Sequence, residues 1–270
     1  MLQKRLPLAV ASLAIFVLFA GDVVKAADEK PAGNGCKSLP NFSALKAALD
    51  AATATETSGL NNQMWATIVD RDGVVCAVAF TGVNRGAQWP GSRVISAQKA
   101  NTANAFSLDS SSSNSGSGQP NGLALSTANL YSAVQPGGSL FGLQESNPVD
   151  TQVAYGGPSS NYGAPQDPMV GHKIGGVNVF GGGLALYGVG KKIVGGVGVS
   201  GDTSCADHNI AWRVRNGLGL DQEIRRVPII SSSTLPRIRT VVQVSVLAGL
   251  VIPPVPTRPV QPRCRRYNRD

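Results

Sequence analysis

Two kinds of cysteine motif are missing from this chain. Its 270 residues include four cysteines and two histidines, but neither a C-x-x-C-H segment nor a pair of C-x-x-C segments. The first absence excludes covalent attachment of a c-type haem, and the second excludes the usual cysteine-rich zinc sites. Since histidine is so scarce, an imidazole ligand for a metal has to come from His172 or His208.

Lysine and acidic residues are nearly absent from the last part of the chain. Residues 224–270 contain nine arginines, seven prolines, no lysine and one acidic residue, whereas the rest has 15 basic and 15 acidic residues. The basic pI near 9.6 therefore describes the tail and not the domain before it. The arginines are not interleaved with aromatic rings as in single-strand binders. We expect residues 223–270 to be a disordered basic tail and expect no nucleic-acid partner.

No apolar run near the N-terminus is long enough for a membrane helix. Lys4 and Arg5 precede an apolar run at residues 6–20, and Val24-Lys25-Ala26 resembles a signal-peptidase site. A membrane helix needs about 20 apolar residues. We therefore expect a cleaved signal peptide at residues 1–27, a linker at 28–42, and a periplasmic or secreted protein; an uncleaved anchor is the alternative.

Export permits disulfide bonds, because the compartments outside the cytosol are oxidising. The four cysteines allow three pairings, and the sequence does not select one. Cys36 and Cys264 flank the domain, where a bond between them would join its ends. Cys76 lies inside an apolar, strand-like segment and is interpreted as a buried thiol.

Apolar periodicity predicts an α+β domain over residues 43–222. Helical spacing occurs at 43–54 and 92–106 and in a short segment at 123–134, with Ser43 as a candidate N-cap. Strand-like runs at 64–70 and 74–80 surround a turn at 70–73, and two glycine-rich strands flank the turn at 190–192. Residues 107–122 and 151–170 have the composition of inserted loops. The second loop contains Tyr155 and Tyr162 and lies just before the glycine-rich strands, where it is placed to cover a site.

The last predicted helix starts at residue 204. Ser204-Cys205-Ala206-Asp207 fits a capping box with Ser204 as the N-cap. At 100° per residue the inner face collects Ala206, Ile210, Ala211 and Val214, and the outer face collects Cys205, His208, Asn209, Trp212 and Arg215. His208 and Trp212 are one turn apart on that outer face, which predicts a ligand site or a subunit contact.

The stretch GGGLALYGVGKKIVGGVGVSGDTSCADHNIAW resembles the C-terminal half of the GlcG/HbpS family, whose pattern is roughly GGGVPL, a turn, VIGAIGVSGGT and a helix. WATIVDRDGVVCAVAFTG and ISAQKANTANAF resemble the family's first hairpin and its following helix, and LYSAVQPGGSLFGLQES resembles its middle segment. The resemblance covers residues 44–220. It implies a profilin-like α+β fold, an antiparallel sheet flanked by helices, and homo-oligomers that bind haem or degrade it to release iron.

The resemblance also implies a tetrapyrrole ligand, either haem or, as a variant, a corrinoid. The candidate cofactor contacts are His208, Trp212, His172, Lys99, Thr203 and Asp207, with His208 and His172 as candidate metal ligands. Lys99 matches the family's lysine in an AxxKA motif, although a lysine on an amphipathic helix is usually solvated.

The family commonly has an acidic pair early in the last helix, where this chain has Asp207 and His208. One carboxylate cannot do the work of two, so haem binding is favoured over haem degradation. We expect a protein that stores, transfers or senses haem, with a membrane sensor or transporter as a further partner.

A dinucleotide-binding oxidoreductase is the alternative interpretation. Residues 196–201 satisfy G-x-G-x-x-G, and Asp221 follows 20 residues later. Rossmann units place this motif in a βαβ repeat with the acidic residue at the end of the second strand. Here Asp221 follows Gly-Leu-Gly-Leu, and the strand before the motif reads as half of a hairpin.

Overall fold

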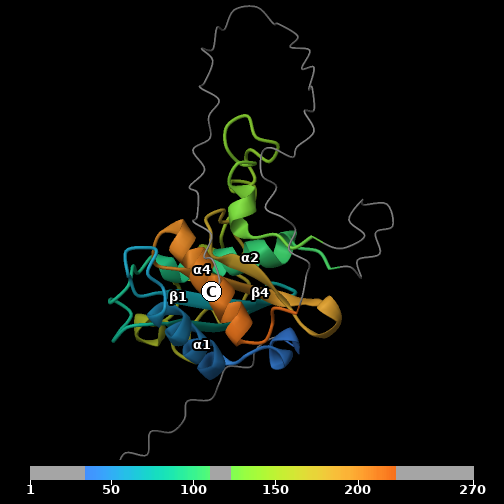
Figure 1. Ribbon diagram of the computed structural model, residues 1–270. Coiled ribbons are helices and arrows are strands. Elements are labelled where there is room, and N and C mark those ends of the chain that lie inside the picture. The colour runs from blue at the N-terminus through green and yellow to red at the C-terminus, as the bar shows by residue number, and fades with distance from the viewer. Residues whose placement is uncertain (1–33, 110–122, 223–270) are drawn as a thin grey trace, which may run out of the picture.

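The computed structural model describes residues 34–109 and 123–222, which form a four-stranded antiparallel sheet between two layers of helices (Figure 1). The strands are β1 (Trp65–Asp70), β2 (Val75–Phe80), β3 (Gly183–Tyr187) and β4 (Ile193–Ser200), in the order β2-β1-β4-β3. Each predicted hairpin forms, and the two hairpins are joined through β1 and β4. The predicted antiparallel α+β fold is confirmed. The predicted signal peptide, the tail and most of the 107–122 loop lie outside the described residues.

Helices cover both faces of the sheet. Helix α2 (Ser92–Phe106) lies across β4, β1 and β3 on one face, whereas α1 (Phe42–Ala54) and α4 (Ser204–Gly217) pack side by side on the other. A short α3 (Thr151–Tyr155) and four 3₁₀ turns complete the fold: η1 (Asn34–Ser38), η2 (Thr127–Leu130), η3 (Ser159–Asn161) and η4 (Val189–Lys191). No helix in the described ranges is long and apolar enough to cross a membrane.

Glycines in β4 allow α2 to lie very close to the sheet. A Cβ at Gly196 would stand 2.3 Å from the carbonyl oxygen of Ala100, and one at Gly198 would stand 1.9 Å from that of Ser96. Both glycines sit inside an antiparallel strand, each facing the helix backbone. The first two glycines of the G-x-G-x-x-G motif therefore serve helix packing, and no phosphate-binding turn forms there. The dinucleotide alternative gains no support from this geometry.

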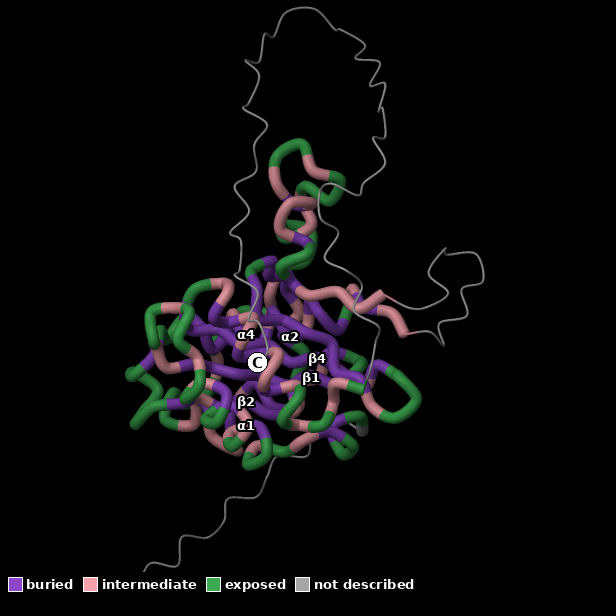
Figure 2. The backbone as a smooth tube through the Cα atoms, viewed as in Figure 1, coloured by how far each residue is buried: buried purple, intermediate pink, exposed green. Residues whose placement is uncertain are grey.

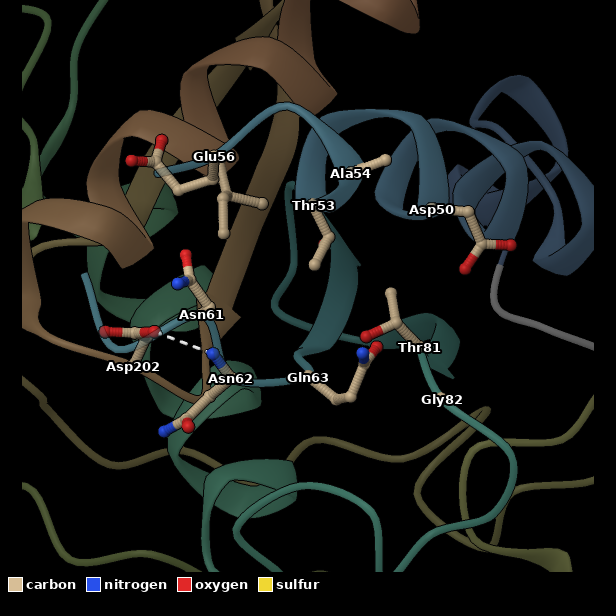
Figure 3. A pocket seen from close by; sticks show the side chains of 11 residues that line it. Asp50, Thr53, Ala54, Glu56, Asn61, Asn62, Gln63, Thr81, Gly82 and Asp202 are labelled. Atoms are coloured by element: carbon tan, nitrogen blue, oxygen red, sulfur yellow. Dashed lines mark hydrogen bonds between the residues drawn. The ribbon is translucent and has the colours of Figure 1, made fainter. Parts of the chain in front are cut away.

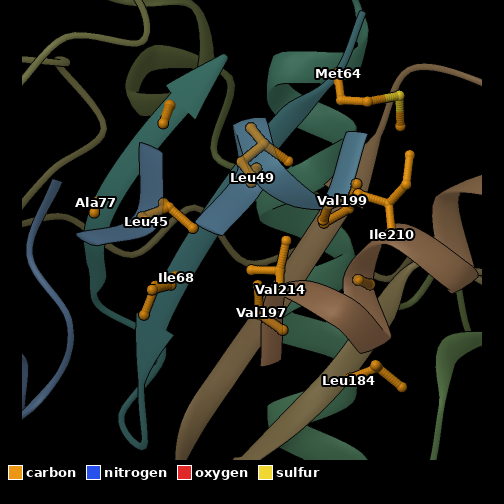
Figure 4. Close-up of a cluster of buried hydrophobic side chains, with 14 of the residues drawn as sticks. Leu45, Leu49, Met64, Ile68, Ala77, Leu184, Val197, Val199, Ile210 and Val214 are labelled. Atoms are coloured by element: carbon orange, nitrogen blue, oxygen red, sulfur yellow. The ribbon is translucent and has the colours of Figure 1, made fainter. Parts of the chain in front are cut away.

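The larger part of the core lies between the sheet and the α1–α4 layer. Figure 4 shows Leu45 and Leu49 of α1 and Ile210 and Val214 of α4 meeting the apolar side chains of β1 and β4. Ala206, Ile210, Ala211 and Val214 are all buried, as their spacing predicts. A second cluster fills the space under α2, and it includes Trp65, Val78, Val94 and Met169. Burial is therefore continuous through both faces of the sheet (Figure 2).

The disulfide pattern differs from the prediction. Cys36 in η1 is bonded to Cys76 in β2, with their Cα atoms 5.2 Å apart. The interpretation of Cys76 as a buried thiol was wrong, and a Cys36–Cys264 bond, which the sequence left open, is excluded because Cys36 is bonded to Cys76. The two bonded residues are separated by 40 positions and meet only because η1 folds back beside the hairpin. Cys205 is also disulfide-bonded.

Residues 126–147 form an arm that projects from the body of the protein (Figure 1). The predicted short helix at 123–134 is reduced to the 3₁₀ turn η2. Leu130 and Val134 anchor the base of the arm against Val177 and Val179. Near its tip, Leu140 and Phe141 are 39% and 67% exposed, which leaves two large apolar side chains in solvent.

Candidate functional site

The start of α4 is built differently from the predicted capping box. Thr203 is the N-cap, and its hydroxyl oxygen accepts from the backbone N–H of Ala206 at 3.3 Å. Ser204 is the first helical residue, and its hydroxyl accepts from the N–H of Gly181 at 2.7 Å. The predicted N-cap was thus wrong by one residue. The reason is that Asp207, the acidic member of the predicted box, turns inward.

Asp207 and Lys99 form a buried ion pair between α4 and α2. The Lys99 Nζ lies 2.6 Å from Asp207 Oδ2 and donates to the carbonyl oxygen of Val199 at 3.0 Å, while Asp207 Oδ1 accepts from the N–H of Asp202 at 2.9 Å. Their side chains are 1% and 4% exposed. The expectation that Lys99 is solvated was wrong. Both groups are committed to each other, and neither is on the outer face of α4.

A run of three glycines covers this ion pair. Gly182 has a φ of +114°, and a Cβ there would lie 2.3 Å from the carbonyl oxygen of Val199 and 3.2 Å from Lys99 Nζ. The segment before β3 can cross the pair this closely only because it has no side chain there. Burial raises the pKa of Asp207 to about 6, against the opposing effect of Lys99, and burial lowers the pKa of Lys99.

Asp202, which drew no attention in the sequence, organises the neighbouring loop. Its carboxylate accepts from the backbone N–H of Leu60 at 2.8 Å and of Asn62 at 3.0 Å, and also from the N–H of Thr203. Burial acts to raise the pKa of Asp202, but these hydrogen bonds outweigh it and the pKa is lowered. Asp202 therefore holds the 60–62 segment against the start of α4 as an anion.

Asp202 also lines a polar cavity of about 380 Å³ between α1, α4 and the ends of β1 and β2 (Figure 3). Each carboxylate of this cavity already has a partner: Asp50 pairs with Lys46, Glu56 with Arg213, and Asp202 with backbone N–H groups. The cavity therefore presents no uncommitted carboxylate to a cation.

His208 lies half-buried at the edge of α4 next to the segment that leads into β3. A Cβ at Gly181 would be 3.2 Å from the Cβ of His208, so the backbone at Gly181 passes beside the histidine. Its Nδ1 is buried and finds no hydrogen-bond partner in the part of the chain that the structure describes. Burial lowers the pKa of His208, and the positive charges of Arg215 and Lys99 lower it further. The imidazole is therefore neutral at pH 7, the form in which histidine binds a metal.

Of the other predicted ligand contacts, Trp212 lies on the same helix face as His208, whereas His172 lies far from it. Trp212 shares its helix face but is half-buried against the core cluster. His172 is exposed, and its carbonyl oxygen accepts from the N–H of Val75 at the outer edge of β2. Since β2 and β3 are the two edges of the sheet, the histidines lie at opposite edges and do not form one site within a chain.

A second cavity, of about 630 Å³, opens near the N-terminus of α2. Tyr155 and Tyr162 line it, so the 151–170 segment does border a cavity, although neither histidine does. Trp65 and Arg93 line it as well, and neither could be recognised from the sequence because they lie inside a regular strand and helix.

One cluster in the described ranges brings together three side chains of metal-binding type: Cys36, Asp70 and Cys76. The two sulfur atoms are bonded to each other, so they are not thiolates and do not act as metal ligands.

These features define an α+β protein whose four-stranded antiparallel sheet carries one helix on one face and two on the other, with a buried ion pair linking the layers. Residues 41–215 match the family model described as Haem degrading protein HbpS-like, and the chain belongs to the HbpS-like family. The family predicted from the sequence is confirmed.

Among solved structures, the Klebsiella pneumoniae protein ORFY is 23% identical, with a TM-score of 0.42 over 67% of this chain and 90% of that one. A PduOC:heme complex is 21% identical, with a TM-score of 0.43 over 69% and 99% of the two chains. A double mutant of HbpS from Streptomyces reticuli is 15% identical, with a TM-score of 0.39 over 79% and 99%. A comparison with curated proteins found no match.

Proposed function

We propose that the protein binds haem through His208. Membership of the HbpS-like family supports a haem ligand. The observation that carries the residue assignment is the state of the His208 ring, which is neutral and half-buried and makes no hydrogen bond through Nε2 to any described residue. A neutral imidazole nitrogen is a common axial donor to haem iron. Phe180, which is 51% exposed and directly precedes Gly181, adds apolar surface for a flat ring.

The second ring nitrogen of His208, Nδ1, affects how strongly the imidazole binds iron through Nε2. A histidine that binds a metal through Nε2 carries its proton on Nδ1, and an acceptor for that proton usually raises the basicity of the ligand. Nδ1 of His208 is buried and has no acceptor among the described residues. The absence of such a partner typically weakens metal binding by about 10- to 100-fold. We therefore propose exchangeable haem, which suits transfer or sensing and requires a recipient such as a membrane sensor or transporter.

Haem degradation is not part of this proposal. The one carboxylate at the start of α4 that corresponds to the family's acidic pair is Asp207, and it is engaged with Lys99 and with the N–H of Asp202. The Asp207 carboxylate is therefore not available to bind iron at the protein surface. Binding without turnover is the role that the described residues support.

Hemin titration tests the proposal. The wild-type protein is expected to bind one hemin per chain with a shifted Soret band. His208→Ala should weaken binding at least tenfold, whereas His172→Ala, the matched control at the opposite edge of the sheet, should not. Unchanged hemin affinity in His208→Ala would assign the ligand to another residue.

Export and assembly complete the proposal. The Cys36–Cys76 disulfide supports an oxidising compartment, and so a periplasmic or secreted protein. Intact mass of the exported chain should show that about 27 residues have been removed.

The exposed Leu140 and Phe141 support a homo-oligomer joined through the arm. Light scattering should report a multimer that Leu140→Ser/Phe141→Ser dissociates, and a monomeric wild-type protein would contradict this.

A further inference from the structure

The 630 Å³ cavity near the N-terminus of α2, here called the aromatic cavity, is separate from His208. Its lining comes from β1, from the loop that joins β2 to α2, from the first turn of α2 and from the 155–162 segment. Small-molecule sites usually have volumes of roughly 300–1,000 Å³. The aromatic cavity is large enough for a ligand of its own.

Its aromatic walls are fixed before any ligand arrives. The Trp65 ring is 1% exposed, packs 5.1 Å from the Phe80 ring and donates its Nε1–H to the carbonyl oxygen of Trp89 at 3.1 Å. The Tyr162 hydroxyl donates to the carbonyl oxygen of Tyr155 at 2.9 Å. Because these side chains are held in place, the cavity keeps its shape and a flat ligand enters it at little conformational cost.

The backbone at Gly163 reinforces this wall. Gly163 has a φ of +73°, and a Cβ there would lie 2.3 Å from Phe80 and 2.7 Å from Trp65. The chain therefore lies directly against the paired rings. Neither ring can tilt toward that side, which keeps the wall rigid.

The charge balance of the aromatic cavity is positive. Arg93 is neutralised by Asp167, with Nε 2.8 Å from Oδ2, and it also donates to the carbonyl oxygen of Ala154 and lies 3.7 Å over the Tyr162 ring. Arg85 is exposed and makes no ion pair or hydrogen bond with any residue that the structure describes. Within residues 34–109 and 123–222, no carboxylate lines the cavity. The N-cap of α2 is Gly91, which has no side chain to cap the helix, so the positive end of the helix dipole adds to this charge.

We propose that the aromatic cavity binds a planar aromatic carboxylate, distinct from the haem held at His208. The ring lies against the exposed Tyr155 and beside Tyr162, and the carboxylate pairs with Arg85. A cation is disfavoured, because the uncommitted charge that the described residues contribute to the lining, that of Arg85, is positive. A neutral aromatic ligand leaves that charge unused and binds more weakly.

Calorimetric titration of the full chain with 2-naphthoate and with its uncharged analogue 2-naphthamide tests this. The acid should bind about tenfold more tightly than the amide, because a charge-assisted hydrogen bond is worth about one such factor. Arg85→Gln should reduce the affinity for the acid to that for the amide, and Tyr155→Ala should weaken both. The matched control is Lys37→Gln, which removes an exposed charge from η1 and should change neither.

Three results would overturn the proposal: equal affinity for acid and amide, unchanged binding of the acid by Arg85→Gln, or equal weakening by Lys37→Gln. Hemin is also flat and carries carboxylates, so the acid is titrated again into hemin-saturated protein. Retained binding supports a separate site, whereas stoichiometric competition refutes it. The His208→Ala hemin titration is read independently, so failure of one proposal is distinguishable from failure of the other.

Discussion

The buried Lys99–Asp207 pair makes a quantitative prediction about folding. Replacing Lys99 by Met leaves the Asp207 carboxylate inside the protein without its cation, and replacing Asp207 by Leu leaves the Lys99 ammonium with the carbonyl oxygen of Val199 alone. Breaking a buried ion pair by removing one partner typically costs about 3–5 kcal/mol. We expect a loss of this size for each single variant in the free energy of unfolding.

The double variant Lys99→Met/Asp207→Leu removes both charges together. It leaves the carbonyl oxygen of Val199 and the N–H of Asp202 without partners, at about 1–3 kcal/mol each. At the middle of these ranges the double variant costs about 4 kcal/mol and the two single variants together about 8. The double variant should therefore cost about 4 kcal/mol less than the sum of the single variants. Urea unfolding of the four proteins measures this coupling. Additivity within about 0.5 kcal/mol would show that the two charges do not interact in solution, and would refute the pair.

Three further perturbations test the fold. Gly198→Ala should destabilise the protein by about 1–3 kcal/mol in urea unfolding, because the added Cβ would meet the backbone of α2 at 1.9 Å. The control Gly217→Ala has room for its Cβ and should be neutral or slightly stabilising. Equal effects of the two variants would contradict the close packing of α2. In a His208→Ala background, the free energy of unfolding should increase as the pH falls from 7 to 5, because the pKa of Asp207 is raised to about 6 from the ordinary 3.8 and the folded state takes up a proton that the unfolded state does not. Adding Asp207→Asn should remove this increase. A free energy of unfolding that decreases with falling pH in the His208→Ala protein would contradict the sign. Joint replacement Cys36→Ala/Cys76→Ala should cost about 4 kcal/mol for a loop of 40 residues, measured by thermal unfolding, and an unchanged transition would argue against the bond.

Local patterns in the sequence determine the elements that were predicted correctly. The spacing over residues 92–106 predicts α2 with the bounds that the structure has, and turn chemistry places both hairpins. The inner face of α4 is also as predicted, because burial on a helix follows from its 3.6-residue period. Helix starts are less well determined: α1 is capped by Asn41 and not Ser43, since the Asn41 side chain accepts from the N–H of Ala44.

Contacts between distant residues account for what the sequence did not show. Lys99 meets Asp207 across 108 positions, and Arg93 meets Asp167 across 74, so neither burial follows from a local pattern. A lone lysine on an amphipathic helix is ordinarily solvated, and only the inward turn of Asp207 changes that. Tyr155 and Tyr162 were noticed in their loop, but their cavity also needs Trp65, which is an ordinary strand residue by sequence. The roles of His208, His172 and Trp212 toward a ligand remain predictions.

The most direct test of the haem proposal is the resonance Raman spectrum of the ferrous haem complex, which reports whether a histidine binds the iron. An iron–histidine stretching band should be present in the wild-type protein and in His172→Ala, and absent from His208→Ala. A band that persists in His208→Ala would contradict the assignment of His208 as the haem ligand.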